Sequence, residues 1–146
     1  MTKLDFSIEL PANSLDLIEL ATSYEDFTQY LPQIKNVKIL EKNDTEVITL
    51  ETMIFKTLFK KEFEMKAKHT LPSKNILKTE FFSGIINGTT IFVEFVDTEN
   101  GTTVNVDIDL KLDFKMKIFQ PLIKKVYKEF LTGTLYKMNT IAMQET

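Results

Sequence analysis

The sequence contains no cysteine, no tryptophan and no arginine, and His69 is its single histidine. Without cysteine the chain forms no disulfide and has no thiolate to act as a nucleophile or a metal ligand. One histidine and no cysteine are also too few ligands for a structural zinc site or an iron–sulfur centre. We therefore expect no metal and no cofactor.

Cations are too sparse for a dedicated nucleic-acid binder. The 146 residues carry a net charge of −3, and the sequence pI is near 5.3. Proteins that bind nucleic acids neutralise phosphates with clustered cations and read bases most often with arginine. The composition therefore predicts no nucleic-acid partner.

Long apolar runs are missing as well. No run approaches the roughly 20 residues that cross a bilayer as a helix. Residues 1–10 alternate charged and apolar side chains, where a secretory signal would present an apolar core. Together with the absence of cysteine, these features predict a cytoplasmic protein.

What is present is the composition of an ordered globular protein, with 43% apolar and 27% charged residues. A chain of this length fits one domain, and it shows no internal repeat and no linker. We therefore expect a single domain over residues 1–146. The sequence carries no signal for an oligomeric state.

The segment 119–144 is predicted to be a long amphipathic helix. Pro121 fits its first turn, where no backbone donor is needed. Apolar or small residues recur at helical spacing with lysines between them. They are Ile123, Val126, Tyr127, Phe130, Thr134, Met138, Ile141 and Ala142.

Most of the chain before this helix has apolar residues at every second position, which is typical of half-buried strands. Asn43-Asp44 and Asn100-Gly101 are tight-turn signals between such segments. Pro11 ends the first strand, and two short helices, 15–22 and 24–30, follow it. The expected strands cover 4–10, 34–42, 46–54, 62–71, 76–82, 90–96 and 104–112.

A sheet of this size needs a cover for its apolar face, and the segment 119–144 is the only long helix available. The predicted fold class is therefore α+β. It consists of a seven-stranded antiparallel sheet, two short helices after the first strand, and a long C-terminal helix over one face.

This order of elements resembles the START-like, helix-grip superfamily over essentially the whole chain. Its members include polyketide cyclases and aromatases, pollen-allergen-like proteins, coenzyme Q-binding START-like proteins and the family of the G subunit of carbon monoxide dehydrogenase. Five features carry the resemblance. They are Leu10-Pro11-Ala12, the helix-turn from Tyr24 to Pro32, Ser83-Gly84 leading to Asn87-Gly88-Thr89, Asn100-Gly101-Thr102, and the closing helix.

The resemblance implies that the sheet curves around the C-terminal helix and leaves an apolar cavity between them. Members of the superfamily hold lipids, quinones, polyketides or hormones there. A curved sheet closed by one helix can enclose more volume than its side chains fill. We therefore interpret the protein as a binder or carrier of an apolar small molecule such as a lipid, an isoprenoid quinone or a polyketide-like compound.

His69 is the most informative titratable residue, because alternation over 62–71 places it on the same face as Phe63 and Met65. It could hydrogen-bond a ligand carbonyl or carry a proton. Alternatively, it is a core histidine bonded to a backbone carbonyl or to Thr79. No nucleophile or paired carboxylate is evident beside it, so no catalytic residue is assigned.

The inward stripe of the last helix is the other candidate lining. Tyr127, Phe130 and Thr134 lie side by side on it at helical spacing. They either line the cavity, with two hydroxyls as polar contacts, or simply pack as core. The predicted ligand-binding residues are His69, Met65, Thr79, Phe81, Tyr127, Phe130 and Thr134.

The segment 55–61 is both basic and apolar, and we expect a loop or bulged corner there. Its residues Phe55, Lys56, Phe59, Lys60 and Lys61 would suit contact with an anionic membrane or an acidic partner. A run of lysines near the last helix could share this surface. The alternative is an ordinary solvated surface. The run comprises Lys111, Lys115, Lys117, Lys124, Lys125 and Lys128.

Two further functions stay open. A cyclase or aromatase would need an acid or base in the cavity. The candidates are His69, Tyr127, Glu51 and Glu94, although alternation favours placing both glutamates outside. An adaptor that docks onto a membrane or a partner, as the resemblance to the carbon monoxide dehydrogenase branch suggests, would use the basic surface instead.

Overall fold

The structure is a computed structural model, and it describes residues 2–31, 33–54 and 62–144. Its strands are β1 (Thr2–Leu10), β2 (Ile34–Lys42), β3 (Glu46–Ile54), β4 (Glu62–Ser73), β5 (Ile76–Phe81), β6 (Thr90–Thr98) and β7 (Gly101–Leu110). Its helices are α1 (Ser14–Ala21), the 3-10 turn η1 (Tyr24–Asp26), α2 (Phe27–Tyr30), the 3-10 helix η2 (Phe114–Phe119) and α3 (Gln120–Gln144).

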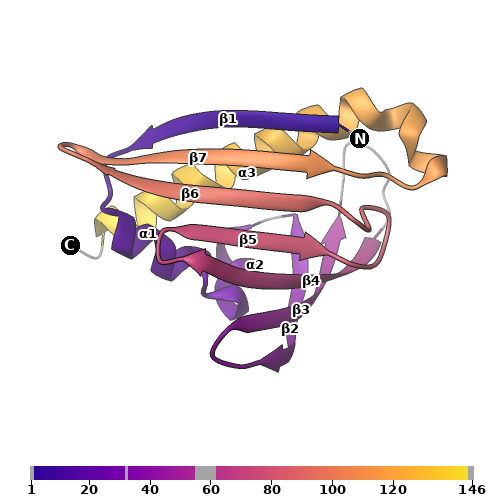
Figure 1. Ribbon diagram of the computed structural model, residues 1–146, viewed down its shortest axis with the longest axis horizontal. Helices are drawn as coiled ribbons and strands as arrows, with labels where there is room; N and C mark the ends of the chain where they lie inside the picture. The colour runs from indigo at the N-terminus through magenta and orange to yellow at the C-terminus, as the bar shows by residue number, and fades with distance from the viewer. Residues whose placement is uncertain (1, 32, 55–61, 145–146) are drawn as a thin grey trace.

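The seven strands form one antiparallel sheet in the order β1-β7-β6-β5-β4-β3-β2. β1 and β2 therefore lie at its two edges. Figure 1 shows the sheet curving between these edges, so that β2 and β3 run in a different direction from β1, β7 and β6, with α1, α2 and α3 behind it. The predicted α+β class, seven strands and helical cover are confirmed.

Local sequence signals explain several of the element boundaries. The Oδ1 of Asn13 accepts from the backbone N–H of Asp16 at 2.9 Å and caps α1. Asn43 Oδ1 accepts from the N–H groups of Thr45 and Glu46, which closes the β2–β3 turn. At the β6–β7 turn, Gly101 has φ +149° and a Cβ there would lie 2.1 Å from the Leu10 carbonyl oxygen. Only glycine fits this approach.

The helix α3 covers the concave face of the sheet over 25 residues. It buries Ile123, Tyr127, Thr134, Leu135, Met138 and Ala142. Leu135 was not part of the predicted stripe, while Val126, Phe130 and Ile141 are only partly buried against the core. The stripe is therefore slightly rotated from the prediction. Among the helices that the structure describes, none combines the length and apolar character needed to cross a bilayer.

Several predicted bounds differ from the structure by one to three residues, and two of these differences have a clear cause. β4 continues to Ser73, past the expected end at residue 71, because Ser73 still pairs with Ile76 after a register shift. The last strand ends at Leu110, because Asp113 accepts a hydrogen bond from the Met116 N–H and starts η2. The chain thus enters the long helix through a 3-10 turn that its sequence pattern did not indicate.

Candidate functional site

A cavity lies between the concave face of the sheet, α3 and the turn formed by η1 and α2. Its volume is about 110 Å³, which is far more than a single buried water needs. Its walls are apolar or aromatic except for Glu51, His69, Thr79 and Thr134. This combination of apolar walls and a few polar groups is typical of small-molecule sites.

The cavity brings together six of the seven predicted ligand-binding residues. They are His69, Thr79, Phe81, Tyr127, Phe130 and Thr134. Met65 is fully buried but does not line the cavity. The loop after β5 covers it, since a Cβ on Gly84 would lie 2.9 Å from the Met65 Cγ.

Other lining residues were not predicted. Tyr24, Phe27 and Leu31 come from the short helical turns, and Met53 and Glu51 come from β3. The turns showed only short helical patterns in the sequence, with no sign of which side chains face the sheet. The available signal in the sequence was the pair of aromatic residues Tyr24 and Phe27, whose rings lie in edge contact in the structure with centroids 5.3 Å apart.

The position of Glu51 corrects the sequence interpretation. Alternation favoured the outer face for it, but Glu51 is 6% exposed and lines the cavity. The inward face of β3 carries Thr49, Glu51 and Met53, whereas its more apolar face is only partly buried. Glu94 does lie outside the cavity, where its carboxylate accepts from the Asn105 side-chain amide.

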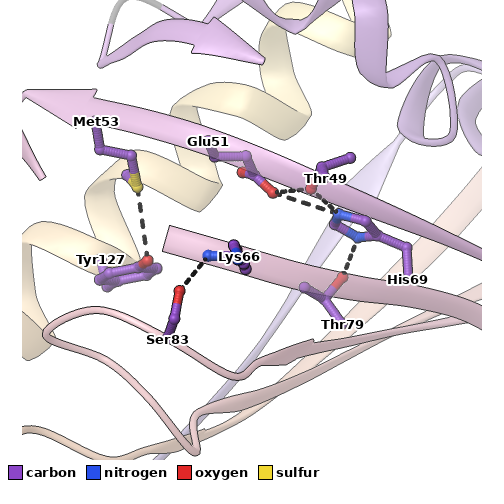
Figure 2. A network of polar contacts seen from close by, with 8 residues as sticks. All are labelled: Thr49, Glu51, Met53, Lys66, His69, Thr79, Ser83 and Tyr127. Atoms are coloured by element: carbon purple, nitrogen blue, oxygen red, sulfur yellow. Dashed lines mark hydrogen bonds and ion pairs between the residues drawn. The ribbon is translucent and has the colours of Figure 1, made fainter. Parts of the chain in front are cut away.

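Glu51 belongs to a buried polar network that joins three neighbouring strands (Figure 2). The Thr49 hydroxyl donates to Glu51 Oε2 at 2.7 Å. His69 Nε2 lies 3.0 Å from the Thr49 oxygen and 3.3 Å from Glu51 Oε2. On its other side, His69 Nδ1 lies 2.9 Å from the Thr79 hydroxyl.

These contacts assign the protons of the network. A hydroxyl has one proton, and that of Thr49 is directed at Glu51, so Nε2 of His69 must supply the hydrogen of its own contact with Thr49. The Thr79 hydroxyl can then donate to an unprotonated Nδ1. Both ring nitrogens of His69 are thereby engaged within the protein.

Two tyrosines complete the polar end of the cavity. The Tyr24 ring stacks on the His69 ring with centroids 4.2 Å apart. The Tyr127 hydroxyl points to Met53 Sδ at 3.9 Å. Burial, and secondly the charge of Glu51, raise the pKa of both tyrosines well above the ordinary value. Both hydroxyls therefore keep their protons at neutral pH.

A second hollow adjoins the cavity at the surface. It is a groove of about 490 Å³ between α2 and α3, and its walls include Gln29, Gln33 and Gly133. Phe130 and Thr134 line both the groove and the cavity. These two side chains therefore form the boundary between the cavity and the outside.

The predicted membrane or partner contacts Phe55, Lys56, Phe59, Lys60 and Lys61 lie outside the described residues. The second half of that prediction, the lysine run, is described, and its members lie before, within and after η2 along the chain. Phe114 and Ile118 project there with 89% and 81% exposure. Over the described part of the chain, no three or more acidic, histidine or cysteine side chains are grouped to hold a metal ion.

The fold has many counterparts among solved structures. The START superfamily protein from Mycobacterium smegmatis superposes with a TM-score of 0.81 at 17% identity, covering 99% of both chains. The Zhui aromatase/cyclase from Streptomyces sp. R1128 gives a TM-score of 0.85 at 9% identity, covering 98% of this chain and 94% of that one. TTHA0849 from Thermus thermophilus gives 0.84 at 13% identity, covering 99% of both chains. At these identities the likeness concerns the fold alone.

Sequence comparison supports the same grouping. No curated protein matches the chain. The model of the family described as "Polyketide cyclase / dehydrase and lipid transport" matches residues 16–138, which include nearly every element from α1 to α3. The chain therefore belongs to the polyketide cyclase / dehydrase and lipid transport family and has the START-like, helix-grip fold.

Proposed function

We propose that this protein binds an apolar small molecule, a lipid, an isoprenoid quinone or a polyketide-like compound, in the cavity between the sheet and α3. The observation that carries the proposal is an apolar cavity inside an otherwise packed core. Transfer of apolar ligand surface from water contributes about 25 cal/mol per Å². A ligand held this way needs few polar contacts, and the cavity supplies few.

The first test is native mass spectrometry of the purified protein, followed by solvent extraction and identification of the bound compounds. We expect a stoichiometric apolar compound. A protein that is purified empty, and that also binds neither fluorescent fatty-acid nor quinone analogues, would contradict the proposal.

A matched pair of variants on α3 connects the ligand to the cavity. Thr134→Phe places a ring at the boundary between the cavity and the groove, and it should remove the co-purifying compound. Thr140→Phe makes the same change at an exposed position of the same helix and should retain the compound. Equal retention in both variants would place the ligand elsewhere.

A carrier must also collect its ligand, and the surface around η2 suits contact with an anionic membrane. Phe114, Ile118 and Leu122 are exposed there, with Lys115 and Lys125 beside them in the sequence. Apolar side chains flanked by lysines favour the interface of anionic bilayers, to which each lysine contributes about 1 kcal/mol.

Co-sedimentation with vesicles tests this surface. We expect binding to phosphatidylglycerol-containing vesicles, little binding to pure phosphatidylcholine, and loss of binding in Phe114→Ser/Ile118→Ser. Leu15→Ser removes an equally exposed apolar side chain from α1 and serves as the control. Binding that is independent of anionic lipid would exclude this role.

A second candidate function is cyclase-like chemistry, and the burial of Glu51 beside His69 favours it. A cyclisation needs a base that removes a proton next to a carbonyl, and a carboxylate in an apolar cavity can do so. The test is deuterium uptake by 2-tetralone in D₂O: the base removes an α-proton, and the enolate takes a deuteron. Uptake should be faster with the protein and fall to background in Glu51→Gln but not in Glu94→Gln. Uptake at the background rate with the unaltered protein would exclude this function.

A further inference from the structure

We infer that the cavity contains a subsite for a ligand head group that donates a hydrogen bond, a hydroxyl or a phenol, and that Oε1 of Glu51 is the acceptor. The inference rests on the proposed binding function, because it specifies the ligand of the same cavity. The ligand that we infer has an apolar body and one neutral polar end.

The carboxylate of Glu51 is used on one side only. Thr49 and His69 both contact Oε2, and in Figure 2 both dashed lines from Glu51 end on that one oxygen. Within the described residues no hydrogen bond reaches Oε1. The side chain is 7% exposed, so bulk water is largely excluded from it. In a cavity with mostly apolar walls, a carboxylate oxygen without a protein donor is a ready acceptor for the hydroxyl of a bound molecule.

His69 is not free to serve the ligand itself. Its Nε2 faces Thr49 and Glu51, and its Nδ1 faces Thr79. The expectation that His69 bonds a ligand carbonyl is therefore replaced by a positioning role. The ring holds Oε2 in place, and Oε1 of Glu51 remains for a molecule in the cavity.

The charges around the cavity select the kind of head group. Among the described residues that line it, none is a lysine, and the chain has no arginine. Tyr24 and Tyr127 are neutral. A fatty-acid carboxylate would thus meet Glu51 with no lysine among the described lining residues to compensate the repulsion. A hydroxyl brings a donor and no charge, so it fits the unused oxygen.

Four naphthalene probes test the inference on the unaltered protein. 2-Naphthol has a hydroxyl that donates a hydrogen bond. Naphthalene is slightly smaller and 2-methoxynaphthalene slightly larger, and neither has a donor. 2-Naphthoate has a carboxylate. Dissociation constants are measured at pH 7 by titration calorimetry. We expect 2-naphthol to bind about tenfold more tightly than both neutral controls, as for a hydrogen bond to a charged acceptor, and 2-naphthoate to bind most weakly.

Glu51→Gln then assigns the selectivity to this side chain. The amide has nearly the shape of the carboxylate but accepts less strongly. The preference for 2-naphthol should fall at least about threefold, while 2-naphthoate should bind more tightly than to the unaltered protein, because the repulsion is gone. A loss of packing alone would not improve the binding of one probe. Glu94→Gln, the same change outside the cavity, should leave all four constants unaltered.

The outcomes separate this inference from the proposed function. If 2-naphthol and the neutral controls bind equally well, or if 2-naphthoate binds best, the head-group subsite is wrong and binding of an apolar molecule stands. If none of the four probes binds and the protein is also purified empty, the binding function fails, and this inference fails with it.

Discussion

β7 and β3 bury their inward side chains to a similar extent, but with different chemistry. On β7 these side chains include Val104 and Ile108, and they are packed as ordinary apolar core. On β3 they include Thr49 and Glu51, which are held by hydrogen bonds. Apolar packing is sufficient for folding, whereas a buried polar network seldom adds stability over apolar side chains of the same volume. The polar face of β3 therefore indicates function rather than folding.

The largest expected effect comes from breaking the polar network at one point. His69→Leu leaves the buried Glu51 carboxylate with Thr49 as its one remaining partner and the Thr79 hydroxyl without its partner on β4. We expect a loss of about 3–5 kcal/mol in the free energy of unfolding. The combined variant Thr49→Val/Glu51→Met/His69→Leu/Thr79→Val replaces the network by apolar side chains and should recover most of this loss. Urea unfolding measures both. A combined variant as unstable as the single one would show that the network stabilises the fold.

A pair of isoleucines compares the filled and the hollow parts of the core. Ile108 on β7 and Ile91 on β6 are partners in the sheet register. Both are buried, but only Ile91 lines the cavity. Truncation to alanine should cost about 3–5 kcal/mol at Ile108 and roughly 2 kcal/mol at Ile91, which has fewer contacts to lose. Equal losses of unfolding free energy would mean that the cavity is closed by packing in solution.

Alkaline pH should lower the free energy of unfolding through Tyr127, which lines the cavity. The folded protein retains the Tyr127 proton above pH 10, where the unfolded chain releases it, since burial and then Glu51 raise the pKa of this tyrosine. The contribution is fully present below about pH 10 and decreases above it by about 1.4 kcal/mol per pH unit. Tyr127→Phe should make the pH dependence of the unfolding free energy shallower above pH 10, by up to about 1.4 kcal/mol per pH unit. An unchanged slope would contradict the buried position of the hydroxyl.

The smallest effect is expected at Gly133, where α3 borders the surface groove. A Cβ there meets nothing within 4 Å. Gly133→Ala should therefore raise the free energy of unfolding by about 1 kcal/mol through helix propensity, with ligand affinity unchanged. Gly133→Leu would fill part of the groove. It should slow ligand exchange if the ligand enters the cavity past Phe130 and Thr134. Stopped-flow release of 2-naphthol distinguishes the two variants.

Much of the fold could be predicted because its signals are local. The ranges 34–42 and 46–54 were predicted as strands and are β2 and β3, since Asn43 sets the turn and alternation sets the strands. The proximity of His69 to Thr79 was also accessible, because β4 and β5 form a short hairpin that pairs these two residues.

The inward position of Glu51 could not be predicted in this way. It follows from the β3–β4 register, in which Glu51 pairs with Met65 and Thr49 with Ala67, and partners share a face. Between these two strands the sequence has the segment 55–61, which shows no turn signature and no alternation, so the pattern does not indicate the register. A shift of one residue would reverse the faces of the strand. Hydrophobicity alone then selects the wrong face, because the outer side of β3 is the more apolar one.

The edge strand β2 has a consequence for how the protein behaves when it is concentrated. An exposed strand edge is a template onto which another chain can add and extend into a fibril. β2 carries Lys35, Lys38 and Lys42 on largely exposed positions, and it is bulged between Ile34 and Asn36 and again between Ile39 and Glu41. Charge and irregular pairing make the β2 edge a poor template, so this edge disfavours aggregation in a protein that keeps a hollow in its core.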